Sequence, residues 1–471
     1  MKKFNKDSYL KKLKLKRNWQ RFSKYFCVGI PCVLCLVLGI YFAYSKFFVS
    51  KEQSVVRTTV GDFIYGDVVI NAYIDGEYSS TIPGKNDGYV VDKVSCDNGA
   101  VGEWNNIDWG LLTTNLTKRT KCNVYFKKVV SKVSDIIAQL DTTGKCPTMN
   151  ADGSVNVTGV EVTNSYLCKA KDAYGDSYYY RGNVTNNYVK FADKYWRIVR
   201  INGDGTVRVI YDGTSAHANG ESSRDRQIGT SVFNSSYNDN TYVGYMYGKI
   251  GASTYADAHA NTNDSTIKAC IDNWYKTNIV GTTNEQYLAD NVFCNGRSIS
   301  SNKPTSNYNN LGYGTNVTAY RWYYGPWESG GYNSSMRLMC PQKNDAFTVS
   351  DITNGNGALT YPVGLLSADE IVLAGGWPAA NSGYYLYSGQ YWWASSPFDF
   401  TGNYARVRSI GSSGYANYSD YVNNNNGVRP VFNLKAEALK YGDGTANNPY
   451  RLTESLDNSF SSESGGIDTG D

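Results

Sequence analysis

Histidine is scarce in this 471-residue chain, which contains only His217 and His259. Neither lies in a recognisable catalytic setting, so a histidine-based triad is not expected. No CxxC motif occurs outside the apolar N-terminal stretch, and the cysteine spacing resembles no zinc site. A glycine-rich phosphate-binding loop is also lacking. These absences predict no catalytic group, no metal and no cofactor.

Positive charge is concentrated at the N-terminus and is in deficit elsewhere. Residues 1–24 contain ten Lys or Arg and one acid, Asp7. Beyond residue 51 the chain carries 34 bases and 41 acids, a net charge of about −7. That part lacks the basic patch that nucleic-acid binding needs, so we expect no nucleic-acid partner.

An uncharged stretch of 21 residues runs from Tyr25 to Ser45. At about 1.5 Å per residue, a helix of this length spans about 30 Å, the thickness of the hydrocarbon core. Ten bases precede it, which predicts a cytoplasmic N-terminus. We therefore expect one uncleaved transmembrane helix over residues 25–49. It would hold the protein in the cell membrane by a single pass, with the C-terminal part extracellular.

Seven cysteines lie beyond this stretch, and an exported chain permits disulfides. Pairs of sequence neighbours close short loops that each stabilise the fold by roughly 3 kcal/mol. The expected pairs are Cys96–Cys122, Cys146–Cys168 and Cys294–Cys340. Cys270 is then the odd thiol on a helix; the alternative is that all seven are reduced.

The chain divides into six predicted segments. Residues 1–24 form a basic cytoplasmic segment, 25–49 the transmembrane helix, 52–127 a small all-β domain, 128–145 a helical linker, 146–455 the main domain and 456–471 a disordered tail. Alternating apolar residues from Gly66 to Ile74 predict strands in the small domain. Apolar residues at helical spacing from Val129 to Leu140 predict the linker helix.

The main domain mixes predicted strands with two helices. Residues 195–201 and 206–211 form a hairpin around Asn202–Gly205. One helix carries Ile267 and Trp274 on one face, with Asp264 or Ser265 as its cap. The other begins at the capping box Ser367–Glu370 and ends at Gly375. Residues 391–394, 404–408 and 428–434 predict an antiparallel meander.

The motifs Tyr391–Pro397 and Gly427–Leu434 resemble a bacterial domain of unknown function, the DUF6273 type. The resemblance extends over about 300 residues and includes Tyr188–Ile198 and Leu359–Glu370. It implies an α+β fold with a distantly C-type-lectin-like main domain, like that of formylglycine-generating enzymes. It also implies an N-terminally anchored surface protein of gut Firmicutes. It implies no particular ligand, and no cysteine follows Cys340 to support formylglycine chemistry.

The C-terminal part of the main domain contains the candidate ligand-binding residues. Aromatic rings and one cation form a contact surface suited to sugars or protein pockets. These residues are Trp392, Trp393, Arg406, Tyr415, Tyr418 and Tyr421. One indole of the adjacent pair is expected in the core, because neighbouring strand residues face opposite sides. The aromatic cluster at residues 322–324 and 327 competes as the site.

These features predict a membrane-anchored extracellular binding protein, an adhesin or receptor for a glycan or protein. One alternative is an envelope structural or sensory module. The other is an exported enzyme acting on glycans through paired carboxylates. The carboxylates available for such a pair are Asp351, Asp369, Glu370, Asp399 and Asp420.

Overall fold

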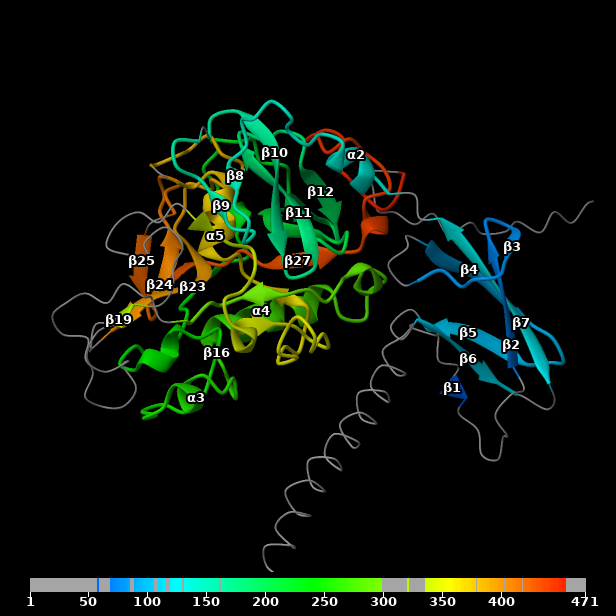
Figure 1. Ribbon diagram of the computed structural model, residues 1–471. Helices are drawn as coiled ribbons and strands as arrows, with labels where there is room; N and C mark the ends of the chain where they lie inside the picture. Colours follow the sequence, from blue (N-terminus) through cyan, green and yellow to red (C-terminus); the bar gives the residue numbers. More distant parts are fainter. Residues whose placement is uncertain are drawn as a thin grey trace, which may run out of the picture. The chain divides into compact units, whose positions relative to one another are not determined.

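The computed structural model describes residues 57–58, 68–84, 89–105, 109–115, 119–128, 131–160, 162–298, 320–321, 335–377, 379–400, 404–416 and 418–454. The chain splits into two compact units, residues 1–128 and 129–471 (Figure 1). Each unit is described by itself.

The first unit consists of two small sheets. One has the strand order β3-β2-β7-β4 and the other the order β1-β6-β5. The strands are β1 (Arg57–Thr58), β2 (Val68–Ile74), β3 (Glu77–Ser79), β4 (Tyr89–Cys96), β5 (Val101–Asn105), β6 (Gly110–Thr114) and β7 (Thr120–Lys128). Its core contains Trp104, Leu111, Val124 and Phe126. Alternate residues of β2 and β7 therefore point into this core and leave the intervening residues on the other face.

The second unit is built on a seven-stranded sheet of order β10-β11-β13-β14-β27-β22, with β12 paired to β13. Its strands are β10 (Ser165–Asp172), β11 (Gly175–Gly182), β12 (Tyr188–Phe191), β13 (Lys194–Ile201), β14 (Val207–Gly213), β22 (Val363–Gly364) and β27 (Val431–Leu434). The predicted hairpin is confirmed as β13 and β14, which pair antiparallel. Gly205 has a φ of 82° in the connecting turn, a conformation that favours glycine.

A second sheet has the order β15-β26-β23-β24-β25, with β19 paired to β23. Its strands are β15 (Thr230–Ser231), β19 (Tyr320–Arg321), β23 (Trp392–Phe400), β24 (Ala405–Ile410), β25 (Tyr418–Tyr421) and β26 (Asn426–Gly427). The remaining strands form small pairs and a triplet: β8 (Thr148–Met149), β9 (Val155–Asn156), β16 (Met246–Tyr247), β17 (Asn263–Asp264), β18 (Phe293–Cys294), β20 (Ser335–Met336) and β21 (Ala346–Phe347).

Helices are short in the part of the chain that the structure describes. They are α2 (Val133–Ile137), α3 (Tyr255–Ala258), α4 (Thr266–Asn278) and α5 (Ala368–Ala374), with 3-10 turns at Arg224–Arg226, Asn240–Val243, Glu285–Tyr287, Lys343–Asp345 and Ala436–Ala438. Both predicted caps are present: Ser265 caps α4, and Ser367 with Glu370 forms a capping box on α5. The helix expected over residues 129–140 is confined to the five residues of α2.

The expected fold class, α+β with a C-type-lectin-like main domain preceded by one transmembrane helix, is wrong. The described chain is mostly β-sheet, and its four α-helices contain 5, 4, 13 and 7 residues. None of them has the length and apolar character needed to cross a membrane. Residues 25–49 themselves lie outside the described residues. The physical reason is that strands dominate through long-range pairing, which local helix signals do not report.

The predicted C-terminal meander is only partly correct. β23 pairs antiparallel with β24, and β24 pairs with β25 (Figure 1). Residues 431–434 instead form β27, which pairs with β14 and β22 in the other sheet. The chain therefore passes from one sheet to the other between β26 and β27.

A buried carboxylate, Glu370, joins α5 to the seven-stranded sheet. Its Oε1 accepts hydrogen bonds from Nε of Arg200 at 3.1 Å and from Nη1 of Arg208 at 2.7 Å. Its Oε2 accepts one from the backbone N–H of Ser367 at 2.9 Å. Although burial alone raises it, Arg208 and Arg200 hold the pKa of Glu370 below its ordinary value. Glu370 therefore serves both the helix cap and the sheet.

Three disulfides cross-link the described residues: Cys96–Cys122, Cys146–Cys168 and Cys294–Cys340. They join the cysteines that the sequence spacing pairs, and Cys270 on α4 forms none. Structural disulfides persist in oxidising environments. The disulfides therefore indicate an extracellular or otherwise oxidising compartment.

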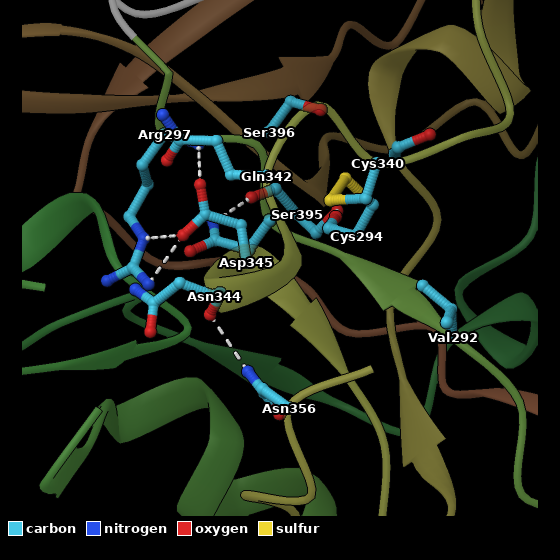
Figure 2. The surroundings of a disulfide bond; sticks show 12 residues. Val292, Cys294, Arg297, Cys340, Gln342, Asn344, Asp345, Asn356, Ser395 and Ser396 are labelled. Atoms are coloured by element: carbon cyan, nitrogen blue, oxygen red, sulfur yellow. Dashed lines mark hydrogen bonds and ion pairs between the residues drawn. A yellow bond between two sulfur atoms is a disulfide. The ribbon is translucent and has the colours of Figure 1, made fainter. Parts of the chain in front are cut away.

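The Cys294–Cys340 disulfide lies beside a buried ion pair (Figure 2). Arg297 donates from its backbone N–H to Oδ2 of Asp345 at 2.7 Å and from Nε to Oδ1 at 2.8 Å. The Ser395 hydroxyl donates to the carbonyl oxygen of Cys294 at 2.6 Å. The disulfide and the ion pair thus hold together β18, the segment before β21, and the middle of β23.

Replacing Glu370 with Gln is expected to lower the free energy of unfolding by about 3–5 kcal/mol, because two buried guanidinium groups lose their carboxylate. Chemical denaturation measures this loss. The matched control is Asp176→Asn, which removes the exposed Lys169–Asp176 pair, whose side chains are 39% and 44% exposed. A surface pair of this kind contributes less than about 1 kcal/mol. Equal effects of the two substitutions would contradict this role for Glu370.

Replacing both Cys294 and Cys340 with Ala is expected to cost about 4 kcal/mol of stability, because the two residues are 46 positions apart and the link restricts the unfolded chain. The midpoint of chemical denaturation without reductant should fall accordingly. Cys270→Ser serves as the control, since that thiol is in no disulfide. An unchanged midpoint in the double variant would show that the link contributes nothing.

Candidate functional site

The two adjacent tryptophans of the expected contact surface are both buried. Trp392 is 1% exposed and Trp393 is 0% exposed. The indole of Trp393 donates to the carbonyl oxygen of Ser231 at 2.8 Å, and the guanidinium of Arg429 lies over the Trp392 ring at 5.0 Å. Both faces of β23 are covered at this point, so neither indole reaches a ligand at the surface.

Neither Tyr415 nor Tyr418 provides a described ring at the surface. Tyr415 is half-buried, and its ring stacks on Trp377 with centroids 5.8 Å apart. The backbone of Tyr418 pairs with Ser409, whereas its side chain lies outside the described part. The aromatic cluster at residues 322–324 and 327 also lies outside the described residues.

Tyr421 belongs to a group of exposed rings, which we call the tyrosine row: Tyr237, Tyr404 and Tyr421. Their exposed fractions are 37%, 41% and 41%. The rings of Tyr237 and Tyr404 are stacked with centroids 5.3 Å apart, and Tyr404 lies 4.9 Å from Tyr421 at an angle of 55°. The three rings therefore form one continuous, partly exposed aromatic cluster.

Arg406 lies beside the row, because it is the cross-strand partner of Tyr421 between β24 and β25. Its Nε and Nη2 donate to the two carboxylate oxygens of Asp399 at 2.7 and 2.5 Å. The guanidinium also lies over the ring of Phe398 at 4.8 Å. A bidentate pair of this kind fixes the orientation of the guanidinium and neutralises its charge. The surface suits a ligand with neutral polar groups.

The sequence did not point to Tyr237 or single out Tyr404. Tyr404 precedes Arg406 by two residues. Because residues two apart on a strand point to the same face, the sequence could have predicted that these two side chains lie together. Tyr237 is far away in the sequence and is brought to the row by a backbone bond in which Ala405 donates to the Tyr237 carbonyl at 2.7 Å. No local pattern reports such a contact.

The carboxylates considered for acid–base chemistry are spread over separate networks. Asp399 pairs with Arg406, and Glu370 with two arginines. Asp351 accepts a hydrogen bond from the Tyr174 hydroxyl at 2.9 Å. Asp420 accepts from the Asn424 and Asn426 amides. Among the described residues, no group of three or more His, Cys, Asp or Glu side chains could hold a metal ion.

Asp369 is the exception, because it is 7% exposed and its Oδ1 accepts from a backbone N–H rather than from a guanidinium. Burial raises the pKa of Asp369 to about 7, although a hydrogen bond from the Arg337 backbone N–H at 3.0 Å opposes the shift. The carboxyl is thus protonated over much of the acidic range. Asp369 lies in the first turn of α5, between the capping-box residues Ser367 and Glu370.

Comparison with known families finds one match. Residues 332–436 match the family described as Domain of unknown function (DUF6273). This segment is similar to that family. The match contains Tyr404, Arg406 and Tyr421 but not Tyr237, and it is shorter than the resemblance expected from the motifs. Searches of curated proteins and of solved structures find no match. The DUF6273 description names no ligand.

The Asp369→Asn variant is expected to remove a pH dependence of stability. The folded chain keeps on Asp369 a proton that the unfolded chain releases near pH 3.8, so wild-type stability falls as the pH rises toward 7. The loss amounts to at most about 1.4 kcal/mol per pH unit. Denaturation at a series of pH values from about 4 to about 8 measures the difference in the free energy of unfolding between the two proteins.

Asp443→Asn is the control for that series. Backbone and side-chain hydrogen bonds from Thr445 lower the pKa of Asp443, so its stabilisation is lost only as the pH falls below the ordinary carboxyl range. This variant should keep a constant offset from wild type where Asp369→Asn does not. Parallel curves for all three proteins would contradict the assignment.

Proposed function

We propose that this protein is an extracellular binding protein, an adhesin or receptor, that contacts a glycan or protein through the tyrosine row and Arg406. The disulfides support an oxidising location. The DUF6273 segment supplies two of the three rings and the guanidinium. The observation that carries the proposal is the clustering of three exposed phenol rings on the end of a sheet.

Clustered tyrosines suit binding for a physical reason. A phenol ring offers a large apolar area and one hydroxyl, and only two side-chain torsions must be ordered on binding. In the tyrosine row the rings already support one another at 5.3 and 4.9 Å, so part of that ordering precedes contact. Preorganised surfaces of this kind gain affinity because less conformational entropy is lost.

The fixed guanidinium adds direction to the surface. Arg406 is held by Asp399 and lies in register with Tyr421, so its remaining N–H groups keep one orientation relative to the rings. Tyr and Arg, together with Trp, are enriched among interface hot spots. Sugar hydroxyls and peptide carbonyls both offer the neutral acceptors that such a group binds.

Substituting Tyr404 with Ala tests the proposal, because Tyr404 contacts both other rings of the row. The purified chain is first screened on a glycan array and against displayed surface proteins. For the ligand found, Tyr404→Ala is expected to weaken binding at least tenfold, about 1.4 kcal/mol. Biolayer interferometry measures the change.

Tyr391→Ala provides the matched control, since Tyr391 is 44% exposed and precedes β23 at the end opposite to the row. Its affinity should equal that of wild type. The proposal fails if Tyr404→Ala and Tyr421→Ala both bind like wild type, or if Tyr391→Ala weakens binding equally.

A further inference from the structure

Lys268 is a buried lysine in the first turn of α4, and its side chain is only 1% exposed. Lysine is almost never fully buried unless it is paired. Its Nζ lies 2.6 Å from Oδ2 of Asp272 and 3.2 Å from Oδ2 of Asp264. Asp272 belongs to the next turn of α4, and Asp264 ends β17. One amino group and two carboxyl groups therefore meet inside the fold.

The carboxyl group of Asp272 lies in surroundings that disfavour charge. Its side chain is 15% exposed, and its neighbour on α4, Ile271, is fully buried. Burial raises the pKa of Asp272, although the hydrogen bond and the charge of Lys268 oppose the rise. Its Oδ1 is buried and accepts no hydrogen bond from the described residues. Burial also raises the pKa of Tyr245, and the charges of Asp272 and Asp264 add to that rise.

Helical spacing holds Lys268 and Asp272 together. Residues four positions apart lie on the same helix face, one above the other. The 2.6 Å contact brings Nζ next to the carboxyl group of Asp272, at the separation from which a held nucleophile reacts. A desolvated lysine is a nucleophile once it has lost its proton. Low polarity favours the uncharged amine and the uncharged acid together, and these are the forms that condense.

Asp264 is placed to move the protons of such a reaction. Its Oδ2 is 3.2 Å from Nζ of Lys268, so it is within reach of the proton that the amine must lose. The side chain of Asp264 is 43% exposed, whereas that of Lys268 is buried. Asp264 therefore connects the buried amine with bulk water. A carboxylate at this distance acts as a general base and then as a general acid.

We propose that Lys268 and Asp272 condense to an amide that cross-links the first two turns of α4. Nζ bonds to Cγ of Asp272, one C–O bond of that carboxyl group breaks, and the oxygen leaves as water. Two of the three ammonium protons leave with this oxygen, carried by Asp264, and the third stays on the amide nitrogen. The reaction transfers no electrons and consumes no other reactant.

The position of α4 gives the cross-link a mechanical role. The helix lies against β22 of the seven-stranded sheet and against β15 of the second sheet. An amide bond would keep the first two turns helical when the surrounding packing loosens. It would also remove a buried charge pair, whose desolvation offsets much of its attraction. The cross-link concerns stability and is separate from binding at the tyrosine row.

Intact-mass spectrometry of the fully reduced, full-length chain tests the proposal. The wild-type chain is expected to be lighter than its sequence mass by one water molecule. The K268Q and D272A variants should each have their full sequence mass. The matched control is K276Q, because Lys276 is an exposed lysine of the same helix. This variant should keep the deficit, and circular dichroism verifies that each variant is folded.

Tryptic mapping of the wild-type chain locates the bond without any variant. Trypsin cleaves after a free lysine but not after an acylated one. Residues 250–276 should therefore appear as one peptide, lighter by one water molecule and uncleaved after Lys268. The exposed pair Lys132–Asp135 is the internal control, with Nζ and Oδ2 3.2 Å apart and side chains 38% and 66% exposed. It should stay uncondensed, with cleavage after Lys132.

The D264N variant tests the proton carrier separately. At equal times after induction, its cross-linked fraction should be smaller than that of wild type, because Lys268 and Asp272 remain but the base is lost. An equal fraction would overturn the role of Asp264. A folded wild-type chain with its full sequence mass and cleavage after Lys268 would overturn the cross-link itself. A water loss that maps outside residues 250–276 would do the same. None of these measurements involves a ligand of the tyrosine row.

Discussion

The buried pairing of Glu370 with Arg200 and Arg208 is the interaction on which the second unit depends. It ties the first turn of α5 to the centre of the seven-stranded sheet. The Ser396 hydroxyl then accepts from the Ala368 backbone N–H at 2.9 Å, which connects the same turn to β23. Because β23 carries Asp399, the geometry around Arg406 rests on this turn of helix. A charge buried without its partners would cost several kcal/mol, so the three elements hold one arrangement.

The cation beside the tyrosine row is paired. Asp399 neutralises Arg406 and fixes the plane of its guanidinium. This arrangement favours hydrogen bonding to neutral groups over binding of a charged ligand.

Local features of the fold were predictable from the sequence. The turn at Asn202–Gly205, the capping box at Ser367 and the Ser265 cap depend on residues a few positions apart, and all three are present. The fold class was wrong, and the strand at residues 431–434 was assigned to the wrong sheet. Those two errors concern pairing between distant segments, which strand propensity does not specify.

For the candidate site, the sequence by itself indicated that Arg406 lies on a strand and that cysteines are spaced for short disulfide loops. Only the structure showed that Tyr421 lies on the neighbouring strand. Only the tertiary structure decided that Trp392 and Trp393 are both buried and that Tyr237 completes the tyrosine row. The reason is that alternation along a strand specifies which side chains share a face, but not which faces are covered. Coverage depends on how sheets and helices pack, and that packing joins residues far apart in the chain.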